Sequence, residues 1–136
     1  MIRIKIVPND TKQVAKVVLL DQENRALFLK RSDYVTKYSG DWDLPGGHLK
    51  EDENIISGLL REVKEETSLE IREPSFLLKI DNLYFFYAKY DSQEIKLSHE
   101  HTDYRFFDKD ELDSSEKFQR VAIEAIRREK DENINN

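Results

Sequence analysis

The sequence has no cysteine, and in 136 residues it has only four glycines and three prolines. Without cysteine the chain forms no disulfide and offers no thiolate to a metal or a substrate, which excludes disulfide frameworks, thiol catalysis and thiolate metal sites. Since glycine and proline are few, the places where they cluster stand out. They meet in the stretch LPGG at 44–47.

Excess positive charge and long hydrophobic runs are also missing. The 28 acidic residues outnumber the 22 basic ones, for a net charge of −6. A general nucleic-acid binder needs a basic surface, so long nucleic acid is not an expected partner. The N-terminus, MIRIKIVPND, alternates in polarity unlike a signal peptide, and no run approaches membrane-spanning length. We therefore expect a cytoplasmic protein without a membrane partner.

The composition that remains is that of a globular protein. Hydrophobic residues make up 38% of the chain and aromatic residues 10%, which is enough apolar surface for one core. The length predicts a single domain over 1–136, with a frayed tail at 131–136. Helices are predicted at 54–67 and 114–130, the second with a serine cap.

The remaining patterns predict strands joined by polar turns. A hairpin is expected for 13–20 and 26–31, and another for 75–80 and 82–90, which turns near Asp81 and Asn82. A long polar loop over 31–54 is typical of a functional segment. Shorter strands are predicted at 3–7, 42–44, 95–97 and 104–107, and a short helical turn at 109–112. Strands alternating with helices in this order predict an α/β protein with a mixed central sheet.

The helix at 54–67 carries an unusual group of acids. At about 100° per residue, Glu65 and Glu66 lie about 60° and about 40° to either side of Glu62, on an arc beside the apolar stripe. Gly58 lies on the same arc and is expected to leave open space there. We expect no cation within this arc. A solvated charged face is one interpretation, and a site for a hard divalent cation is the other.

The segment 47–69, GHLKEDENIISGLLREVKEETSL, resembles the Nudix box, and the preceding WDLPGG is similar to that family's usual approach to it. The matching positions are Gly47, Glu53, Arg61, Glu62, Val63, Glu65, Glu66 and Leu69. Ser68 departs from the pattern, because it stands where the family has glycine at the helix end, and we expect a modest stability cost or a different cap. Lys50 stands where the family often has glutamate.

The resemblance implies a Nudix-type α/β/α sandwich and hydrolysis of a pyrophosphate bond in a nucleoside diphosphate linked to another group. It implies Mg²⁺ as the cofactor, with Mn²⁺ as a substitute. Glu62 and Glu66 are the implied main metal ligands, joined by Glu65 and the carbonyl of Gly47. Glu65 is also implied in catalysis. Arg61 and Glu53 are expected to form an ion pair that orients the glutamates, and a plain pair of Arg61 with Glu65 is the alternative.

Other site residues are less determined. Glu100, flanked by His99 and His101, is a candidate base or further metal ligand, and the alternative is that all three face solvent. Tyr84 and Phe86 share one face of a strand and are candidates for stacking a base, or are simply core. Arg31 is a candidate phosphate contact, as is Lys37, or else both are solvent-exposed.

Three substrate classes remain open: nucleoside triphosphates, which the small size favours; ADP-ribose or nucleotide sugars; and dinucleoside polyphosphates or capped RNA. A non-catalytic nucleotide-binding module is a further alternative, although the intact carboxylates argue against it. A homodimer through the strand at 3–7 or through the last helix is possible, and nothing in the sequence selects it.

Overall fold

One mixed sheet forms the centre of the computed structural model, which describes residues 12–32 and 41–135. Its strands are β1 (Val14–Leu20), β2 (Ala26–Arg31), β3 (Trp42–Asp43), β4 (Gly46–His48), β5 (Ser75–Ile80), β6 (Leu83–Lys89) and β7 (His101–Phe107). Along the main path their order is β3-β2-β1-β6-β5, while β4 pairs with β1 and β7 pairs with β2. Because β1 runs parallel to β6 and antiparallel to β2 and β4, the sheet is mixed, as predicted.

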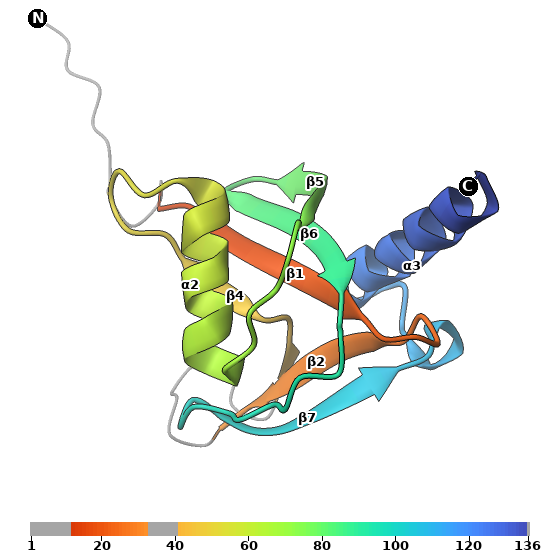
Figure 1. Ribbon diagram of the computed structural model, residues 1–136, viewed down its shortest axis with the longest axis horizontal. Helices are drawn as coiled ribbons and strands as arrows, with labels where there is room; N and C mark the ends of the chain where they lie inside the picture. The colour runs from red at the N-terminus through yellow and green to blue at the C-terminus, as the bar shows by residue number, and fades with distance from the viewer. Residues whose placement is uncertain (1–11, 33–40, 136) are drawn as a thin grey trace, which may run out of the picture.

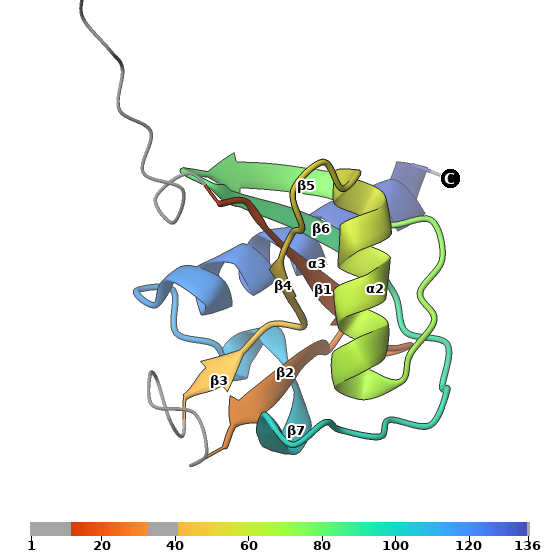
Figure 2. The same ribbon diagram turned by 90° about the vertical axis from the view of Figure 1, so that its left-hand side faces the viewer.

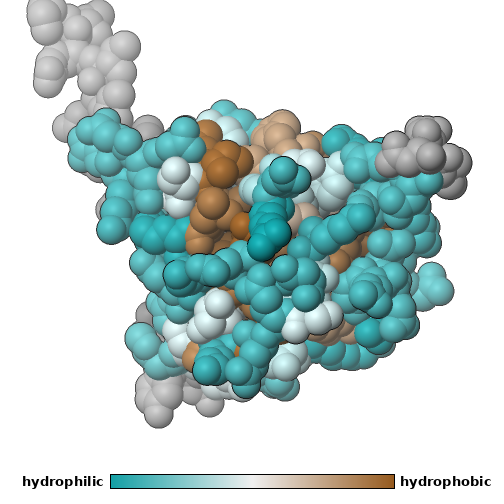
Figure 3. Space-filling model, viewed as in Figure 1, coloured by the Kyte–Doolittle hydropathy of each residue, from teal (hydrophilic) through white to brown (hydrophobic). Residues whose placement is uncertain are grey.

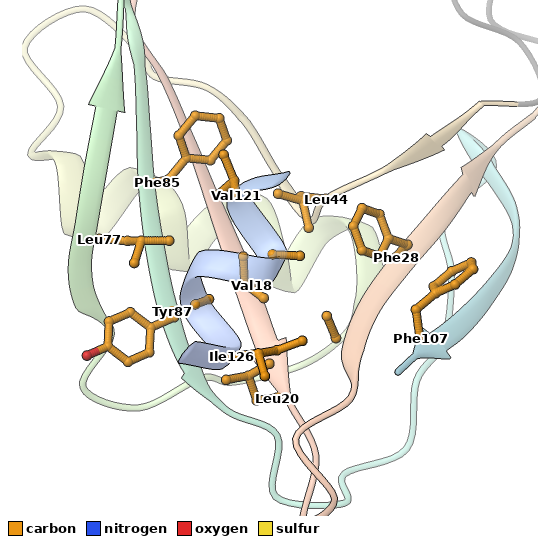
Figure 4. Close-up of a cluster of buried hydrophobic side chains, with 13 residues drawn as sticks. Val18, Leu20, Phe28, Leu44, Leu77, Phe85, Tyr87, Phe107, Val121 and Ile126 are labelled. Carbon is orange, nitrogen blue, oxygen red and sulfur yellow. The ribbon is translucent and has the colours of Figure 1, made fainter. Parts of the chain in front are cut away.

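Two long helices lie on opposite faces of this sheet, α2 (Ile55–Thr67) on one and α3 (Lys117–Asn135) on the other. Every residue of β1 is buried because both faces are covered. Its alternate side chains enter different cores: Val17 and Leu19 pack on the α2 side, and Val18 and Leu20 on the α3 side. Figure 4 shows the α3-side core, where Val121 and Ile126 of the helix meet the sheet. The predicted α/β/α sandwich is therefore confirmed.

Most of the predicted elements are present. The turn at Asp81 joins β5 to β6, and Asp81 has a φ of 53° there. β1 and β2 are antiparallel, but they pair only at Leu20 and Ala26, because β3 takes the same edge of β2 further along while β7 pairs with the other edge. The short strand near Trp42 and the helical turn at 109–111 are also found. β4 was not predicted, since its two glycines are typical of a turn.

Two sequence predictions are wrong. The segment 95–97 is not a strand, because the backbone N–H groups of Lys96 and Ser98 donate to the carbonyls of Thr67 and Glu66 at the end of α2. No serine caps α3. Glu116 instead accepts a hydrogen bond from the N–H of Gln119 through its side chain, at 3.0 Å. In both cases a nearby side chain or helix end supplies the partner that the sequence pattern could not specify.

The segment 131–136, predicted as a frayed tail, is helical as far as Asn135, and its fraying stays a prediction. Arg127 pairs with Asp131 at 2.7 Å, one turn further along the helix, and the hydroxyl of Tyr87 donates to the carboxylate of Glu132. These contacts hold the last turns, which contain neither glycine nor proline. The predicted strand at 3–7, Lys37 and Asn136 lie outside the described residues.

The molecular surface on the α2 side is mainly hydrophilic, with one hydrophobic area over α2 and the neighbouring β5 and β6 (Figure 3). Phe76, on the edge strand β5, is 54% exposed and packs edge-on against Phe86. Among the described residues, no helix has the length and apolar character needed to cross a membrane.

Candidate active site

The first turn of α2 fixes the orientation of the acidic face. Asn54 caps the helix, with its side-chain oxygen accepting from the N–H groups of Ile56 and Ser57 at 3.0 and 3.2 Å. The three glutamates that follow lie in different environments: Glu66 is buried, Glu62 is 19% exposed and Glu65 is 58% exposed at the side chain. The arc of acids is therefore graded from the protein interior to solvent, unlike a uniformly solvated face.

Glycines allow β4 to press against both β1 and α2. A Cβ on Gly47 would lie 2.5 Å from Oε2 of Glu62, so only glycine leaves room for that carboxylate. Gly46 has a φ of 128°, and a Cβ there would meet the carbonyl oxygen of Ala15 at 2.1 Å. The backbone of Gly46–Gly47 is thus brought next to the acidic face of α2, as the sequence predicts for a close approach.

Glycine is needed at position 58 for a different reason from the one predicted. The expected open space is not there, because a Cβ on Gly58 would lie 2.3 Å from Cδ2 of Leu49 and 2.9 Å from Oε1 of Glu53. The loop between β4 and α2 fills the space. Gly58 therefore allows this loop, and the Glu53 carboxylate with it, to pack on the helix.

Arg61 links this loop to the glutamates. Its guanidinium contacts both oxygens of Glu53, at 2.8 and 2.9 Å, which confirms the predicted ion pair. The same group lies 3.0 Å from Glu62 and 3.2 Å from Glu65, so the alternative pairing with Glu65 is present as well. The expectation that no cation lies within the arc of acids is wrong, because the Arg61 guanidinium contacts Glu62. The hydrogen bond from Arg61 lowers the pKa of Glu53 to about 2.

Glu66 is the most deeply buried of the three glutamates on the acidic face of α2, at 6% exposure. One of its oxygens accepts a hydrogen bond from the N–H of Gly46 at 2.8 Å. Burial raises the pKa of this carboxyl to about 8, and the nearby positive charge of Lys16 opposes that shift. The charge of this buried carboxylate is only partly balanced by its neighbours. A bound cation would stabilise the ionised form of Glu66, so the group is suited to be a cation ligand.

A pocket of about 770 Å³ connects these groups to the start of α3. Glu62, Glu66 and the two glycines line it together with Phe118 and Lys117 of α3. Of the other predicted site residues, Arg31 and Glu100 line this pocket, whereas Glu65, Tyr84 and Phe86 are not among its lining residues. Further lining residues are Val14, Lys16, Asp41, Trp42, Asp43, His48, Asn82, Leu83 and Glu116.

Tyr84 and Phe86 belong to the core on the α2 side of the sheet, Phe86 as a buried member and Tyr84 as a partly buried one. The core alternative therefore describes the position of both. The aromatic rings at the pocket are Trp42, which packs edge-on against Phe107, and Phe118, which packs against Phe85. Sequence reasoning did not single out either ring, because Trp42 lies on β3 and Phe118 on α3, and only the fold brings these two elements to the same pocket.

The residues around Glu100 divide between solvent and interior. Glu100 and His99 are exposed, and the Glu100 carbonyl accepts from the N–H of Ser32 at 2.9 Å. His101 is only 4% exposed, so the solvent-facing alternative is wrong for it. Within the described residues neither of its ring nitrogens has a hydrogen-bond partner, and burial lowers its pKa. Pairing of β7 with Arg31 of β2 turns this side chain inward.

Sequence reasoning missed two charged residues beneath the pocket. Lys16 is 8% exposed, and its Nζ lies 3.1 Å from each oxygen of Asp43. Arg31 also reaches Asp43, at 3.2 Å. A signal was available, because a lone lysine interrupts the apolar run VAKVVLL of β1.

The oxygen atoms of Glu62, Glu66 and the nearby glycine backbone could supply some of the ligands of a metal ion. Among residues 12–32 and 41–135, no three His, Cys, Asp or Glu side chains converge closely enough to enclose a metal ion. Mg²⁺ does not require such a cage, since it keeps several waters and is usually held by one or two carboxylates and by substrate phosphates. Glu62 and Glu66, with the glycine backbone pressed against Glu62, match that pattern.

The helix that carries these acids ends at Ser68, which has a φ of 67° and whose N–H donates to the carbonyl of Lys64. Serine thus adopts the left-handed conformation in which glycine is usual, with its hydroxyl 3.3 Å from the carbonyl oxygen of Lys96. The cap geometry is preserved, although the residue differs from the family pattern.

Comparison with known proteins places these features in a family. The NUDIX domain model matches residues 10–132. Nudix hydrolase 6 of Arabidopsis thaliana is 41% identical over 59 residues, which are 43% of this chain and 21% of that protein. The 8-oxo-dGTP diphosphatase of Buchnera aphidicola is 36% identical over 61 residues, 43% of this chain and 49% of that one. The chain therefore spans less than half the length of these two curated relatives.

The fold also resembles solved structures. An ADP-ribose pyrophosphatase from Streptococcus suis superposes with a TM-score of 0.69 and 21% identity, covering 86% of this chain and 92% of that one. At this level of identity the likeness concerns the fold alone.

Proposed function

Because the chain belongs to the NUDIX domain family, we propose that it is a divalent-cation-dependent pyrophosphohydrolase that cleaves a pyrophosphate bond in a small nucleotide. The observation that carries this proposal is the meeting of Glu62 and Glu66 with the glycine backbone of β4 in a large pocket. A polyanionic pyrophosphate needs positive charge at the point of attack, and these residues offer the oxygen ligands that hold such charge.

In this proposal Glu62, Glu66 and the carbonyl of Gly47 hold the cation, and the more exposed Glu65 completes its shell or accepts a proton. Mg²⁺ or Mn²⁺ bound there would offset the phosphate charge and lower the pKa of a bound water. Arg61 and Glu53 hold Glu62 and Glu65 in orientation through the ion pairs already described. Glu100, which lines the same pocket from the start of β7, is the candidate general base.

The aromatic side chains of the pocket suit a nucleoside. Trp42 and Phe118 offer aromatic surface for a base, so they replace Tyr84 and Phe86 in that proposed role. Arg31 and Lys117 bring positive charge to the pocket, which favours a phosphorylated ligand. A nucleoside triphosphate is the first candidate, in line with the name of the Buchnera relative. ADP-ribose or a nucleotide sugar is the second, in line with the Streptococcus structure, and dinucleoside polyphosphates or capped RNA are the third.

The direct test is a panel of these nucleotides, assayed for release of phosphate or pyrophosphate with and without Mg²⁺. We expect Mg²⁺-dependent turnover of at least one member, and a loss of about 10²- to 10³-fold in kcat for Glu66→Gln. Glu70→Gln is the matched control, because Glu70 is exposed beyond the end of α2 and its carboxylate pairs with the exposed Lys64. Equal turnover by Glu66→Gln and wild type would sink the ligand assignment.

A non-catalytic nucleotide-binding module is the competing function. It would bind a panel member in a calorimetric titration and hydrolyse none of them at any Mg²⁺ concentration. The intact set of Glu62, Glu65 and Glu66 favours the enzyme, because it offers both cation ligands and a proton acceptor, and binding alone does not require the second.

A further inference from the structure

Lys16 is buried in the central strand β1, at 8% exposure. Removing an ammonium group from water costs several kcal/mol unless it finds partners. Lys16 finds four oxygens within 3.2 Å: both carboxylate oxygens of Asp43, and the carbonyl oxygens of Leu44 and Gly46. All four belong to the continuous stretch 43–46, so one side chain of β1 holds the connection between β3 and β4.

That connection leads directly to the proposed cation ligands Glu66 and Glu62. The Gly46 carbonyl accepts from Lys16 at 3.2 Å, while its N–H donates to Glu66 at 2.8 Å. The next residue, Gly47, approaches Glu62 so closely that a Cβ would lie 2.5 Å from its oxygen. Both polar groups of Gly46 are therefore fixed, one by Lys16 and the other by Glu66.

We propose that Lys16 is a positioning residue, whose ammonium group holds the Gly46–Gly47 backbone against Glu66 and Glu62 so that the cation and the substrate meet a preformed set of oxygens. This role rests on the function proposed above. The simpler role, neutralising a buried Asp43, does not require the bonds to two carbonyls. Arg31 already brings a second cation within 3.2 Å of Asp43. The carbonyl contacts set geometry, and a displacement of about 1 Å at a reacting centre costs about 10²-fold in rate.

Lys16→Met keeps much of the side-chain volume and removes the ammonium group. We expect kcat to fall about 10²-fold while KM changes by less than about threefold, because the ligand geometry is altered while Trp42 and Phe118 keep their packing against Phe107 and Phe85. The amide hydrogen of Gly46 should exchange with solvent faster than in wild type, because the carbonyl of the same residue has lost its ammonium donor and Gly46 can move more easily away from Glu66. Lys89→Met is the control: this lysine is 77% exposed at the side chain, and kcat and Gly46 exchange should both stay at wild-type values.

The double variant Lys16→Met/Asp43→Leu separates positioning from charge neutralisation. It removes the lysine together with its buried carboxylate partner, a replacement that proteins often tolerate without loss of stability. The proposal expects it to fold, to remain slow and to keep fast Gly46 exchange. Recovery of wild-type kcat with a protected Gly46 amide would overturn it, because Lys16 would then serve only Asp43. Failure of both variants to fold would overturn it as well, because Lys16 would then act in folding.

The two proposals fail in different ways. If wild type hydrolyses no nucleotide, the proposed function fails, and Gly46 exchange in Lys16→Met still shows whether Lys16 holds this backbone. If wild type is active and Lys16→Met keeps its kcat, the function stands and the positioning role is overturned.

Discussion

Arg61 on α2 and Arg127 on α3 each bind several carboxylates, yet they do different things. Arg127 pairs with Glu124 and Asp131 of its own helix, at 54% side-chain exposure. Arg61, at 23% exposure, reaches Glu53 in a preceding loop as well as two glutamates of its helix. Surface pairs within one helix contribute a few tenths of a kcal/mol. A partly buried cation that joins separate segments also fixes their relative position, which is the role proposed for Arg61.

The largest effect is expected where the backbone meets α2. Gly47→Ala places a methyl group 2.5 Å from the Glu62 oxygen and must displace that carboxylate. We expect kcat to fall about 10²-fold, because the ligand moves by the order of an ångström. Ser57→Ala, on the exposed face of the same helix, should keep full activity. Steady-state kinetics on the best nucleotide of the panel provides the measurement, and an unchanged kcat in Gly47→Ala would show that the close approach is unimportant.

Exchanging each arginine for lysine tests the comparison itself. Arg61→Lys keeps the charge and loses the fork that contacts both oxygens of Glu53. We expect about a tenfold loss in kcat, in the range found when groups that orient metal ligands are removed. Arg127→Lys should leave kcat unchanged and shift the unfolding free energy by less than about 0.5 kcal/mol. Similar kinetics for the two variants would mean that Arg61 is only another surface ion pair.

The stability of the protein in acid should further distinguish the ion pairs of Arg61 from those of Arg127. The Arg61 contact lowers the pKa of Glu53 to about 2, so the stabilisation is present above the ordinary pKa of about 4.5 and is lost as the pH falls from 4.5 towards 2. Arg61→Met should remove this part of the pH dependence. Urea unfolding of wild type and variant at several pH values between 2 and 6 measures it. Parallel stability curves for the two proteins would contradict the assignment.

The smallest effect concerns the end of α2. Ser68 adopts a φ of 67°, where a residue with a Cβ is strained and glycine is not. Ser68→Gly should raise the unfolding free energy by about 0.5 kcal/mol, since relief of about 1 kcal/mol is partly offset by loss of the weak hydroxyl contact to Lys96. Thermal unfolding measures the change, and a lower melting temperature would show that the serine hydroxyl is the stronger term.

Local patterns predicted much of this molecule. The apolar stripe and the Asn54 cap predicted α2, because they depend on neighbours along one helix. The resemblance to the Nudix box implied the ion pair of Glu53 with Arg61. Burial of Lys16 and His101 was not predicted, since it depends on which strands lie beside β1 and β2. Tyr84 and Phe86 show the same limit: alternation gave them one shared face, and only the placement of α2 decided that this face is core.

The central claim is that the buried end of the acidic arc holds a divalent cation. Mn²⁺ titration followed by electron paramagnetic resonance measures this without any substrate. The account predicts binding by wild type, unchanged binding by Glu124→Gln on α3, and affinity lower by at least about tenfold in Glu66→Gln. Equal Mn²⁺ affinity in all three proteins would contradict it.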